Sequence, residues 1–173
     1  MDATPNYHPA SVIWLTGLSG AGKTTIAEIL FEEFKKQKKP VELLDGDIIR
    51  KLFPNTGFSK EARIEHIKRV AFTASRLEQH GINVIVSLIS PFEESREFAK
   101  SLCKNFHEIY IATPLEECQR RDPKGLYKKY NEGLIKNLSG VDEIYEAPKN
   151  PKATINTIGR SPLSCAEEIL RLL

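Results

Sequence analysis

Eight consecutive residues have the types and the spacing that bind phosphate groups. Residues 17–24, Gly17-Leu18-Ser19-Gly20-Ala21-Gly22-Lys23-Thr24, match the pattern G-x-x-x-x-G-K-[ST] at every position. The glycines allow backbone N–H groups to close around phosphate oxygens at the positive end of a helix dipole. Lys23 would contact the β- and γ-phosphates, and the Thr24 hydroxyl would ligate Mg²⁺. We therefore expect this loop to bind a nucleoside triphosphate, which by itself does not specify the reaction.

Two carboxylates follow a short apolar run further along the chain. Residues 41–44 predict a strand, and Asp45-Gly46-Asp47 comes directly after it. Ligands of open α/β sheets bind at the carboxyl ends of the strands. Two carboxylates at that edge can hold Mg²⁺ through water, and one of them can orient or deprotonate an attacking hydroxyl.

Two segments of the chain are strongly basic, although its formal net charge is only +2. Residues 119–138 and residues 50–69 each carry a net charge of +4. The first segment has no strand pattern and includes Arg121, so we expect a mobile lid, about residues 119–148, that closes over phosphates. In the second, Arg50, Phe58 and Arg63 are suited to an anionic acceptor with an aromatic base that stacks on the phenyl ring.

The composition of the 173 residues excludes several classes of protein. The length and the apolar content predict one globular domain, residues 1–173, and the net charge argues against a nucleic-acid binder. No apolar stretch approaches the ~20 residues that span a bilayer, so we expect no membrane association. Three cysteines without a C-x-x-C pair favour free thiols in a reducing cytoplasm, and the histidines form no metal-binding pattern.

Apolar runs rich in β-branched residues alternate with helical patterns along the chain. This alternation predicts an α/β fold, a P-loop three-layer sandwich with a mostly parallel five-stranded sheet and helices on both faces. The expected strands cover residues 12–15, 41–44, 83–89, 108–112 and 153–158, and the expected main helices cover residues 23–37, 59–81, 91–103 and 161–172.

Side chains near the expected helix ends predict how those helices begin. Ser59 is expected to cap the long second helix, and Ser90 to cap the helix that begins at Pro91. Thr113-Pro114-Leu115-Glu116 matches a capping box. The last helix follows Ser161-Pro162, and we expect it to be buried through Leu163, Ile169 and Leu170.

The remaining motifs narrow the reaction class. The guanine-reading tetrapeptide N-K-x-D of GTPases does not occur, which leaves a small-molecule kinase whose lid excludes water. The ordered motifs over residues 12–156 resemble the adenylyl-sulfate kinase family. Besides the phosphate loop, the resemblance is carried by Leu44-Asp45-Gly46-Asp47, Gly57-Phe58-Ser59, Ile89-Ser90-Pro91, Arg121-Asp122-Pro123-Lys124-Gly125-Leu126-Tyr127-Lys128-Lys129, Gly140-Val141-Asp142 and Tyr145-Glu146-Ala147-Pro148.

This resemblance implies a reaction of sulfate assimilation. The γ-phosphoryl group of ATP, with Mg²⁺, would pass to the ribose 3′-hydroxyl of adenosine 5′-phosphosulfate and give 3′-phosphoadenylyl sulfate. It also implies a cytoplasmic homodimer. Asp47 would lie near the attacking hydroxyl, with Lys23 and Asp45 beside it, and Thr24 and Asp45 would hold the metal. ATP would be bound by Gly17, Ser19, Gly20, Ala21, Gly22, Lys23, Thr24, Thr25 and Arg121, and the acceptor by Asp47, Arg50, Phe58, Arg63, His66, Ile89, Ser90, Lys128, Val141 and Asp142.

The chain departs from the family pattern at several positions. His66 stands where the family has asparagine, Leu138-Ser139-Gly140-Val141-Asp142 replaces Phe-Thr-Gly-Ile-Asp, and the interval between Arg50 and Phe58 is shorter than usual. These departures concern the acceptor more than the reaction. A related kinase for another nucleotide, such as a cytidine diphosphate phosphoramidate, and a catalytically silent nucleotide-binding module therefore remain open alternatives.

Overall fold

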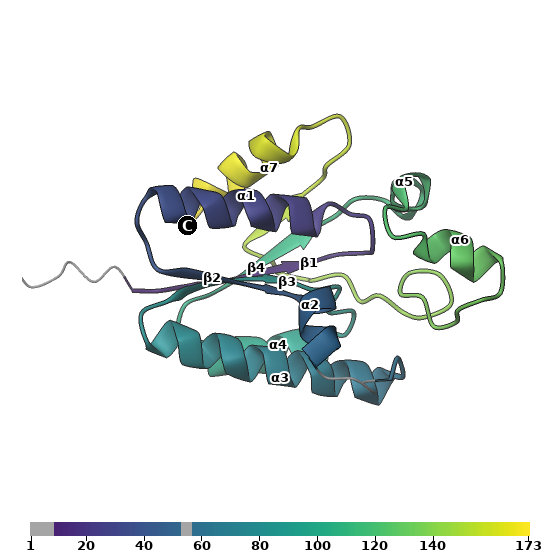
Figure 1. Ribbon diagram of the computed structural model, residues 1–173, viewed down its shortest axis with the longest axis horizontal. Coiled ribbons are helices and arrows are strands. Elements are labelled where there is room, and N and C mark those ends of the chain that lie inside the picture. Colours follow the sequence, from purple (N-terminus) through teal and green to yellow (C-terminus); the bar gives the residue numbers. More distant parts are fainter. Residues whose placement is uncertain (1–8, 53–56) are drawn as a thin grey trace, which may run out of the picture.

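Five parallel strands form one sheet in the computed structural model, which describes residues 9–52 and 57–173 (Figure 1). The strands are β1 (Val12–Thr16), β2 (Val41–Asp45), β3 (Asn83–Ser87), β4 (Phe106–Ile111) and β5 (Ala153–Ile155). Their order across the sheet is β2-β3-β1-β4-β5, and every neighbouring pair is parallel. The helices are α1 (Lys23–Lys36), α2 (Gly46–Leu52), α3 (Lys60–Gln79), α4 (Glu93–Leu102), α5 (Leu115–Arg121), α6 (Leu126–Asn131) and α7 (Pro162–Leu170).

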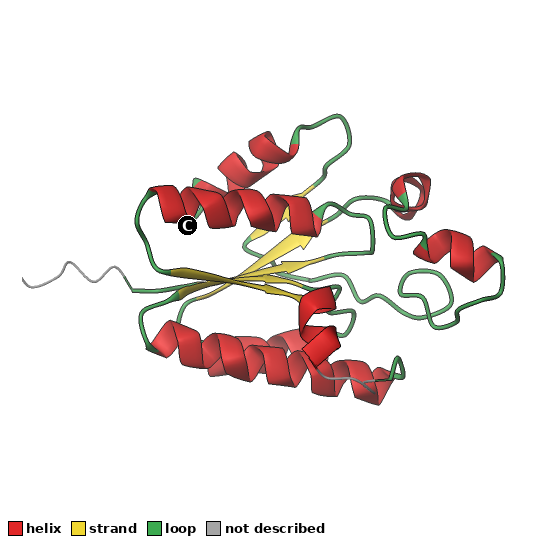
Figure 2. Cartoon of the chain, in the orientation of Figure 1, coloured by secondary structure: helices red, strands yellow, loops and turns green. Residues whose placement is uncertain are grey.

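Helices cover both faces of the sheet, with α1 and α7 on one side and α3 and α4 on the other (Figure 2). Alternate residues of β1 enter the two apolar cores. Ile13 and Leu15 pack in the core that includes α1 and α7, whereas Val12 and Trp14 pack in the core that includes α3. Burial on both faces explains why the central strands are nearly continuous apolar runs. The predicted α/β fold is confirmed.

The parallel arrangement gathers several loops at one edge of the sheet. The phosphate loop follows β1, Asp45 ends β2, and residues 88–91 follow β3. Helices α5 and α6 project beyond this same edge, at the right of Figure 1. Because all the carboxyl ends point the same way, residues far apart in the chain meet there.

The helix cap expected at Ser59 is present, and Ser161 provides a further cap that was not predicted. The hydroxyl oxygen of Ser59 accepts a hydrogen bond from the N–H of Ala62, and that of Ser161 accepts one from Ser164. Two strands end earlier than predicted: β3 ends at Ser87, and β5 ends at Ile155. After β5 the chain turns, and the N–H of Ile158 donates to the side chain of Asn156.

Two other predictions about helix caps were wrong. Thr113 does not cap α5, whose N-cap is Pro114, because its hydroxyl donates instead to the carbonyl oxygen of Ala21. Ser90 does not cap α4, which begins at Glu93, because its hydroxyl accepts from the indole N–H of Trp14.

The buried face of helix α7 agrees only in part with the prediction. Leu163 is 51% exposed, and Leu170 is only partly buried. Ile169 is buried as expected, but the rest of the buried face is formed by Cys165 and Ala166. Within the part of the chain that the structure describes, no helix combines the length and the apolar character needed to cross a membrane.

Candidate active site

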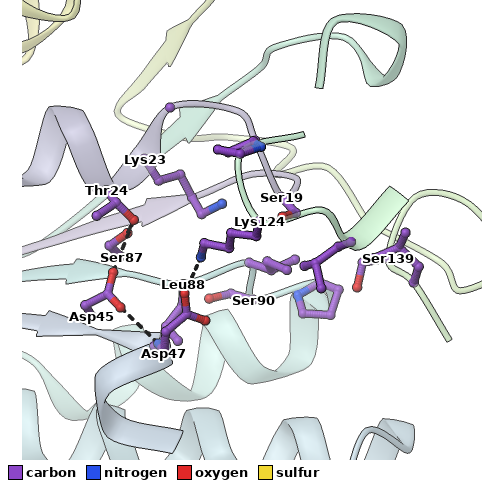
Figure 3. A pocket seen from close by; sticks show the side chains of 18 of the residues that line it. Ser19, Lys23, Thr24, Asp45, Asp47, Ser87, Leu88, Ser90, Lys124 and Ser139 are labelled. Carbon is purple, nitrogen blue, oxygen red and sulfur yellow. Dashed lines mark hydrogen bonds and ion pairs between the residues drawn. The ribbon is translucent and has the colours of Figure 1, made fainter. Parts of the chain in front are cut away.

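A cavity of about 1020 Å³ lies at the carboxyl edge of the sheet. It is lined by the phosphate loop, by the ends of β2 and β3, by α2 and α3, and by parts of the basic segment (Figure 3). The sequence-predicted residues that line it are Ser19, Gly20, Gly22, Lys23, Thr24, Thr25, Asp45, Asp47, Arg50, Phe58, Arg63, His66, Ile89, Ser90 and Arg121. The structure thus brings most of the expected site together in one cavity.

The phosphate loop depends on glycine where its backbone is tightest. Gly17 has φ +150°, and a Cβ atom there would lie 2.5 Å from the carbonyl oxygen of Ile111. Gly22, at φ +104°, is the N-cap of α1. Without a Cβ, the chain can turn sharply from β1 into α1 and direct its N–H groups at an anion.

The Lys23 ammonium is folded into the loop itself. Its Nζ atom donates to the carbonyl oxygens of Gly17, at 2.9 Å, and Leu18, at 2.8 Å. Burial lowers the pKa of Lys23 from 10.5 to about 8, and the positive charge of Lys124 adds to this effect. A group of this kind gains stabilisation when a polyphosphate binds, because the anion replaces the missing counter-charge.

The loop is supported from below by hydroxyl groups. Thr113 Oγ1 donates to the carbonyl oxygen of Ala21 at 2.8 Å, and Thr157 Oγ1 donates to the same oxygen at 3.3 Å. The phenol of Tyr127, on α6, donates to the carbonyl oxygen of Ser19 at 2.9 Å. Ala21 is therefore buried in the core, which explains why it does not line the cavity.

Asp45 and Thr24 form a small cluster of oxygen atoms. Thr24 Oγ1 donates to Asp45 Oδ2 at 3.2 Å and lies 3.4 Å from the hydroxyl of Ser87. The other carboxylate oxygen of Asp45 accepts from the backbone N–H of Asp47 at 2.9 Å, which sets its orientation. A hydroxyl and a carboxylate suit Mg²⁺, which takes its other ligands from phosphates and water. Among the described residues, no three His, Cys, Asp or Glu side chains gather closely enough to hold a metal by themselves.

Asp47 lies in the first turn of α2 and forms an ion pair with Lys124 of the basic segment (Figure 3). Both side chains line the cavity and are about half exposed. The carboxylate is thus held toward the space beside the phosphate loop, and its partner is a flexible lysine that an arriving substrate can displace.

Two guanidinium groups lie near one aromatic ring on the side of the cavity formed by α2 and α3. The Phe58 ring is 57% exposed, and its centroid lies 4.8 Å from Cζ of Arg50 and 5.6 Å from Cζ of Arg63. Arg63 Nε also donates to the carbonyl oxygen of Phe58 at 2.9 Å. A partly exposed phenyl ring with two cations nearby suits a ligand that is both planar and anionic. Part of the short interval between Arg50 and Phe58, residues 53–56, lies outside the described residues.

His66 lines the same cavity one turn of α3 after Arg63. Its side chain is 1% exposed, yet neither ring nitrogen has a hydrogen-bond partner among residues 9–52 and 57–173. Burial, together with the positive charges of Arg50 and Arg69, lowers its pKa from 6.5 to about 4. The imidazole is therefore neutral at physiological pH and carries one unused donor and one unused acceptor.

Four predicted residues besides Ala21 lie outside the cavity lining. Gly17 serves through its carbonyl oxygen, which binds Lys23. Lys128 lies on the exposed side of α6, with its Nζ atom 4.0 Å from a carboxylate oxygen of Glu132. Val141 is 38% exposed. The Asp142 carboxylate accepts from two backbone N–H groups, at Asn137 and Leu138, and so shapes the loop whose Ser139 hydroxyl accepts from Arg63.

Sequence reasoning missed several residues that line the cavity. Ser87 ends β3 beside Asp45, with which it pairs in register. Thr157 and Arg160 come from the loop between β5 and α7, and Pro162 is the first residue of α7. Thr157 accepts from Nη1 of Arg121 at 2.8 Å. The available signal was their position, because every loop after a parallel strand reaches the same edge.

In this chain a phosphate loop joins the first strand to the first helix, a carboxylate follows the next strand, and a basic segment reaches the same cavity. This is the architecture of P-loop kinases. A family model described as Adenylylsulphate kinase matches residues 9–156. The chain belongs to the adenylylsulphate kinase family.

Individual relatives support this membership. The adenylyl-sulfate kinase of Pseudomonas aeruginosa is 48% identical over 174 residues, which cover 99% of this chain and 88% of that protein. A probable adenylyl-sulfate kinase of Pyrococcus abyssi is 48% identical over 160 residues, 92% of each chain. The solved structure of the Mycobacterium tuberculosis APS kinase CysC in complex with AMPPNP and APS is 36% identical, with a TM-score of 0.90 over 95% of this chain and 97% of that chain.

Proposed function

We propose that this protein transfers the γ-phosphoryl group of ATP to the ribose 3′-hydroxyl of adenosine 5′-phosphosulfate and releases ADP and 3′-phosphoadenylyl sulfate. The observation that carries the proposal is the single cavity that holds both a phosphate loop and a cation-flanked aromatic ring, with Asp47 in its wall. The M. tuberculosis relative, solved with AMPPNP and APS together, supports a cavity of this size for two nucleotides.

ATP binds at the phosphate loop in this proposal. Ser19, Gly20 and Gly22 supply backbone N–H groups, Lys23 leaves its carbonyl partners for the β- and γ-phosphates, and Thr25 extends the loop into α1. Arg121 and Thr157, which are already hydrogen-bonded to each other, line the part of the cavity toward the β5–α7 loop.

Asp47 is the proposed base. Its carboxylate accepts the proton of the 3′-hydroxyl as that oxygen bonds to the γ-phosphorus, and the bond from the γ-phosphorus to the bridging oxygen breaks to leave ADP. Lys124 gives up its ion pair with Asp47 when the acceptor binds. The released ammonium then lies beside the phosphates and offsets their charge.

We further propose that Thr24 and Asp45 hold Mg²⁺. The fit is supported by their hydroxyl and carboxylate oxygens, which lie 3.2 Å apart, and by Ser87 beside them. The ion would neutralise charge on the β- and γ-phosphates. Lys23 and Asp45 therefore act by positioning the triphosphate, Lys23 by offsetting its negative charge directly and Asp45 by holding the metal ion.

The acceptor would lie against α2 and α3. Its base stacks on Phe58, its phosphosulfate pairs with Arg50 and Arg63, and His66 offers a neutral donor or acceptor to the base. Ile89 and Ser90 form the opposing wall. Lys128, Val141 and Asp142 would join the site only if residues 119–148 move as a lid, as their positions outside the cavity require.

The assembly proposed from the family resemblance is a cytoplasmic homodimer. Light scattering coupled to size-exclusion chromatography would test it, since a dimer has twice the chain mass of 19.5 kDa. A monodisperse species of one chain mass at micromolar concentration would contradict the dimer and leave the reaction unaffected.

The substrate is tested by ADP release in a coupled assay with Mg²⁺-ATP and a panel of acceptors. Adenosine 5′-phosphosulfate should give acceptor-dependent release, and adenosine monophosphate should not. ADP release only with a cytidine diphosphate phosphoramidate would identify the alternative, a kinase for another nucleotide. That alternative remains open because His66 replaces the asparagine of the family pattern. Nucleotide binding without transfer to any acceptor would identify a silent module.

A further inference from the structure

Arg96 is a charged side chain on α4 that is almost completely buried and does not line the cavity. It is 2% exposed, and three of its nitrogen atoms donate to three different segments. Nε donates to the carboxylate of Glu108, on β4, at 2.7 Å. Nη1 donates to the carbonyl oxygen of Ser90 at 2.7 Å, and Nη2 donates to that of Glu146, also at 2.7 Å. One guanidinium group therefore joins β4, the loop after β3 and Glu146, near the end of the expected lid.

Ser90 has a backbone conformation that its own residue type does not favour. Its φ is +45°, in the left-handed region that non-glycine residues rarely adopt. Arg96 holds its carbonyl oxygen, and the indole N–H of Trp14 donates to its hydroxyl at 3.0 Å. The surrounding contacts impose this conformation, which places Ser90 and its neighbours Ile89 and Pro91 in the wall of the cavity (Figure 3).

Glu146 is bound at three of its atoms. Its carbonyl oxygen accepts from Arg96, its N–H donates to the carbonyl oxygen of Pro91 at 2.8 Å, and its carboxylate accepts from the N–H of Glu93 at 2.6 Å. Since Glu93 is the first residue of α4, the carboxylate also lies at the positive end of that helix dipole.

Tyr145 provides a second connection to the same wall. Its hydroxyl lies 2.9 Å from Thr16 Oγ1, which donates to the carbonyl oxygen of Ile89 at 2.7 Å. Residues 145–146 are thus tied to residues 89–91 by three connections: one through Arg96, one through Thr16, and the direct hydrogen bond from the N–H of Glu146 to Pro91.

We propose that Arg96 is a positioning residue that holds the acceptor wall, residues 89–91, and the end of the lid, residues 145–146, in one fixed arrangement. The inference rests on the proposed acceptor site. Residues 122–140 lie between α5 and the anchored residues 145–146, and they contain Lys124 and Ser139. Because their C-terminal end is anchored, residues 122–140 can move while the acceptor wall, residues 89–91, stays in place. Arg96 touches no substrate and acts through Ser90 and Glu146.

Lysine cannot replace this guanidinium group. Arginine presents donors in a planar fork, whereas an ammonium group is a compact point charge that cannot reach three acceptors in three directions. Arg96→Lys preserves the buried charge beside Glu108 but must lose at least one of the two carbonyl contacts. Arg76→Lys, on the exposed face of α3, is the matched control, because the Arg76 guanidinium is exposed and donates to the neighbouring side chain of Gln79.

The primary experiment compares both variants with the wild-type protein by steady-state kinetics and by hydrogen exchange. Arg96→Lys should raise KM for adenosine 5′-phosphosulfate at least tenfold and change KM for ATP less than twofold. It should also speed amide exchange in peptides that cover residues 88–92 and 143–148. Arg76→Lys should change none of these quantities. Equal rises of both KM values, or wild-type exchange in both peptides, would overturn the proposal.

Tyr145→Phe decides the matter if Arg96→Lys does not fold. This variant keeps the ring that stacks on Tyr110, with centroids 6.0 Å apart, and removes only the contact to Thr16. It should speed exchange over residues 143–148 and raise the acceptor KM about threefold, because the lid end is proposed to fix the acceptor wall. Faster exchange over residues 143–148 with a wild-type acceptor KM would overturn the proposed coupling between the two. Hydrogen exchange needs no substrate, so the anchor can be confirmed even if the proposed acceptor proves wrong.

Discussion

The ammonium group of Lys124 forms an ion pair with the carboxylate of Asp47, although 77 positions separate them in the chain. Lys124 belongs to the basic segment of residues 119–138, and Asp47 lies in the first turn of α2. The two side chains are 45% and 58% exposed, so solvent screens the pair and it contributes little to stability. Such a pair can open at low cost, and it links the position of the lid to the availability of the proposed base.

Replacing Asp47 by asparagine tests its role as the base. Asp47→Asn keeps the shape but removes the proton acceptor, so kcat should fall about 10²- to 10⁴-fold. KM for ATP should change little, because the phosphate loop is untouched. Glu42→Gln, which changes an exposed carboxylate on β2, is the control and should retain full activity. A kcat within tenfold of the wild-type value would show that another group accepts the proton.

Lys23 should take up a proton when ATP binds near pH 8.5. Its pKa is about 8 in the ligand-free protein, so most molecules carry a neutral lysine at this pH. The triphosphate favours the charged form and raises that pKa, so binding should consume roughly 0.5–0.8 proton. Affinity for ATP should accordingly fall as the pH rises from 7 to 9.5. Calorimetry in two buffers of different ionisation enthalpy measures the uptake.

Two variants of this experiment identify the group. Lys23→Ala should show no uptake and no turnover, and measurable turnover would refute the role of the phosphate loop. Lys124→Gln removes the second cause of the lowered pKa of Lys23, so the uptake should shift to higher pH. Unchanged uptake in Lys23→Ala would mean that a different residue binds the proton.

Exchanging His66 for leucine should separate stability from function. The two imidazole nitrogens are buried without partners, and a leucine avoids that cost, so the ligand-free protein should become more stable by about 1–3 kcal/mol. At the same time KM for the acceptor should rise about tenfold, with KM for ATP unchanged. Thermal unfolding and initial-rate kinetics measure the two effects. An unchanged acceptor KM would mean that His66 only fills space.

His66 should also weaken the protein in mild acid. Its pKa falls from 6.5 to about 4 on folding, so between these values the unfolded chain binds a proton that the folded protein does not. The free energy of unfolding must therefore decrease as the pH falls from 6.5 to 4, by about 1.4 kcal/mol per pH unit for this group. Urea unfolding at pH 7, 5.5 and 4.5 measures the slope. His66→Leu should show a shallower slope than the wild type, and the exposed His80→Leu should not.

The strands, the main helices and most of the cavity lining were predictable because their signals are local. The loop from Gly17 to Thr24 is contiguous, and the alternation of apolar runs with helical patterns implies parallel strands. Parallel strands in turn imply that residues after β1, β2 and β3 meet at one edge. Asp45, Asp47 and Ser90 could thus be placed in one site without coordinates.

Hydroxyl side chains were less predictable, because a local and a remote partner compete for them. Thr113 and Ser90 each precede a helix, where a cap is the local choice. In the folded protein Thr113 donates to Ala21, 92 positions away, and Ser90 accepts from Trp14, 76 positions away. The remote partners prevail because packing of the sheet and its loops brings these buried polar groups within hydrogen-bond distance of each other.

What the sequence by itself determined is the class of chemistry: a loop that binds a triphosphate, carboxylates at a strand end, and basic segments for two anions. Only the tertiary structure decided how those groups are held. It paired Lys124 with Asp47, left His66 buried without a partner, and bound Ser90 and Glu146 to Arg96. These relationships depend on distances between remote segments, which arise only when the whole chain packs.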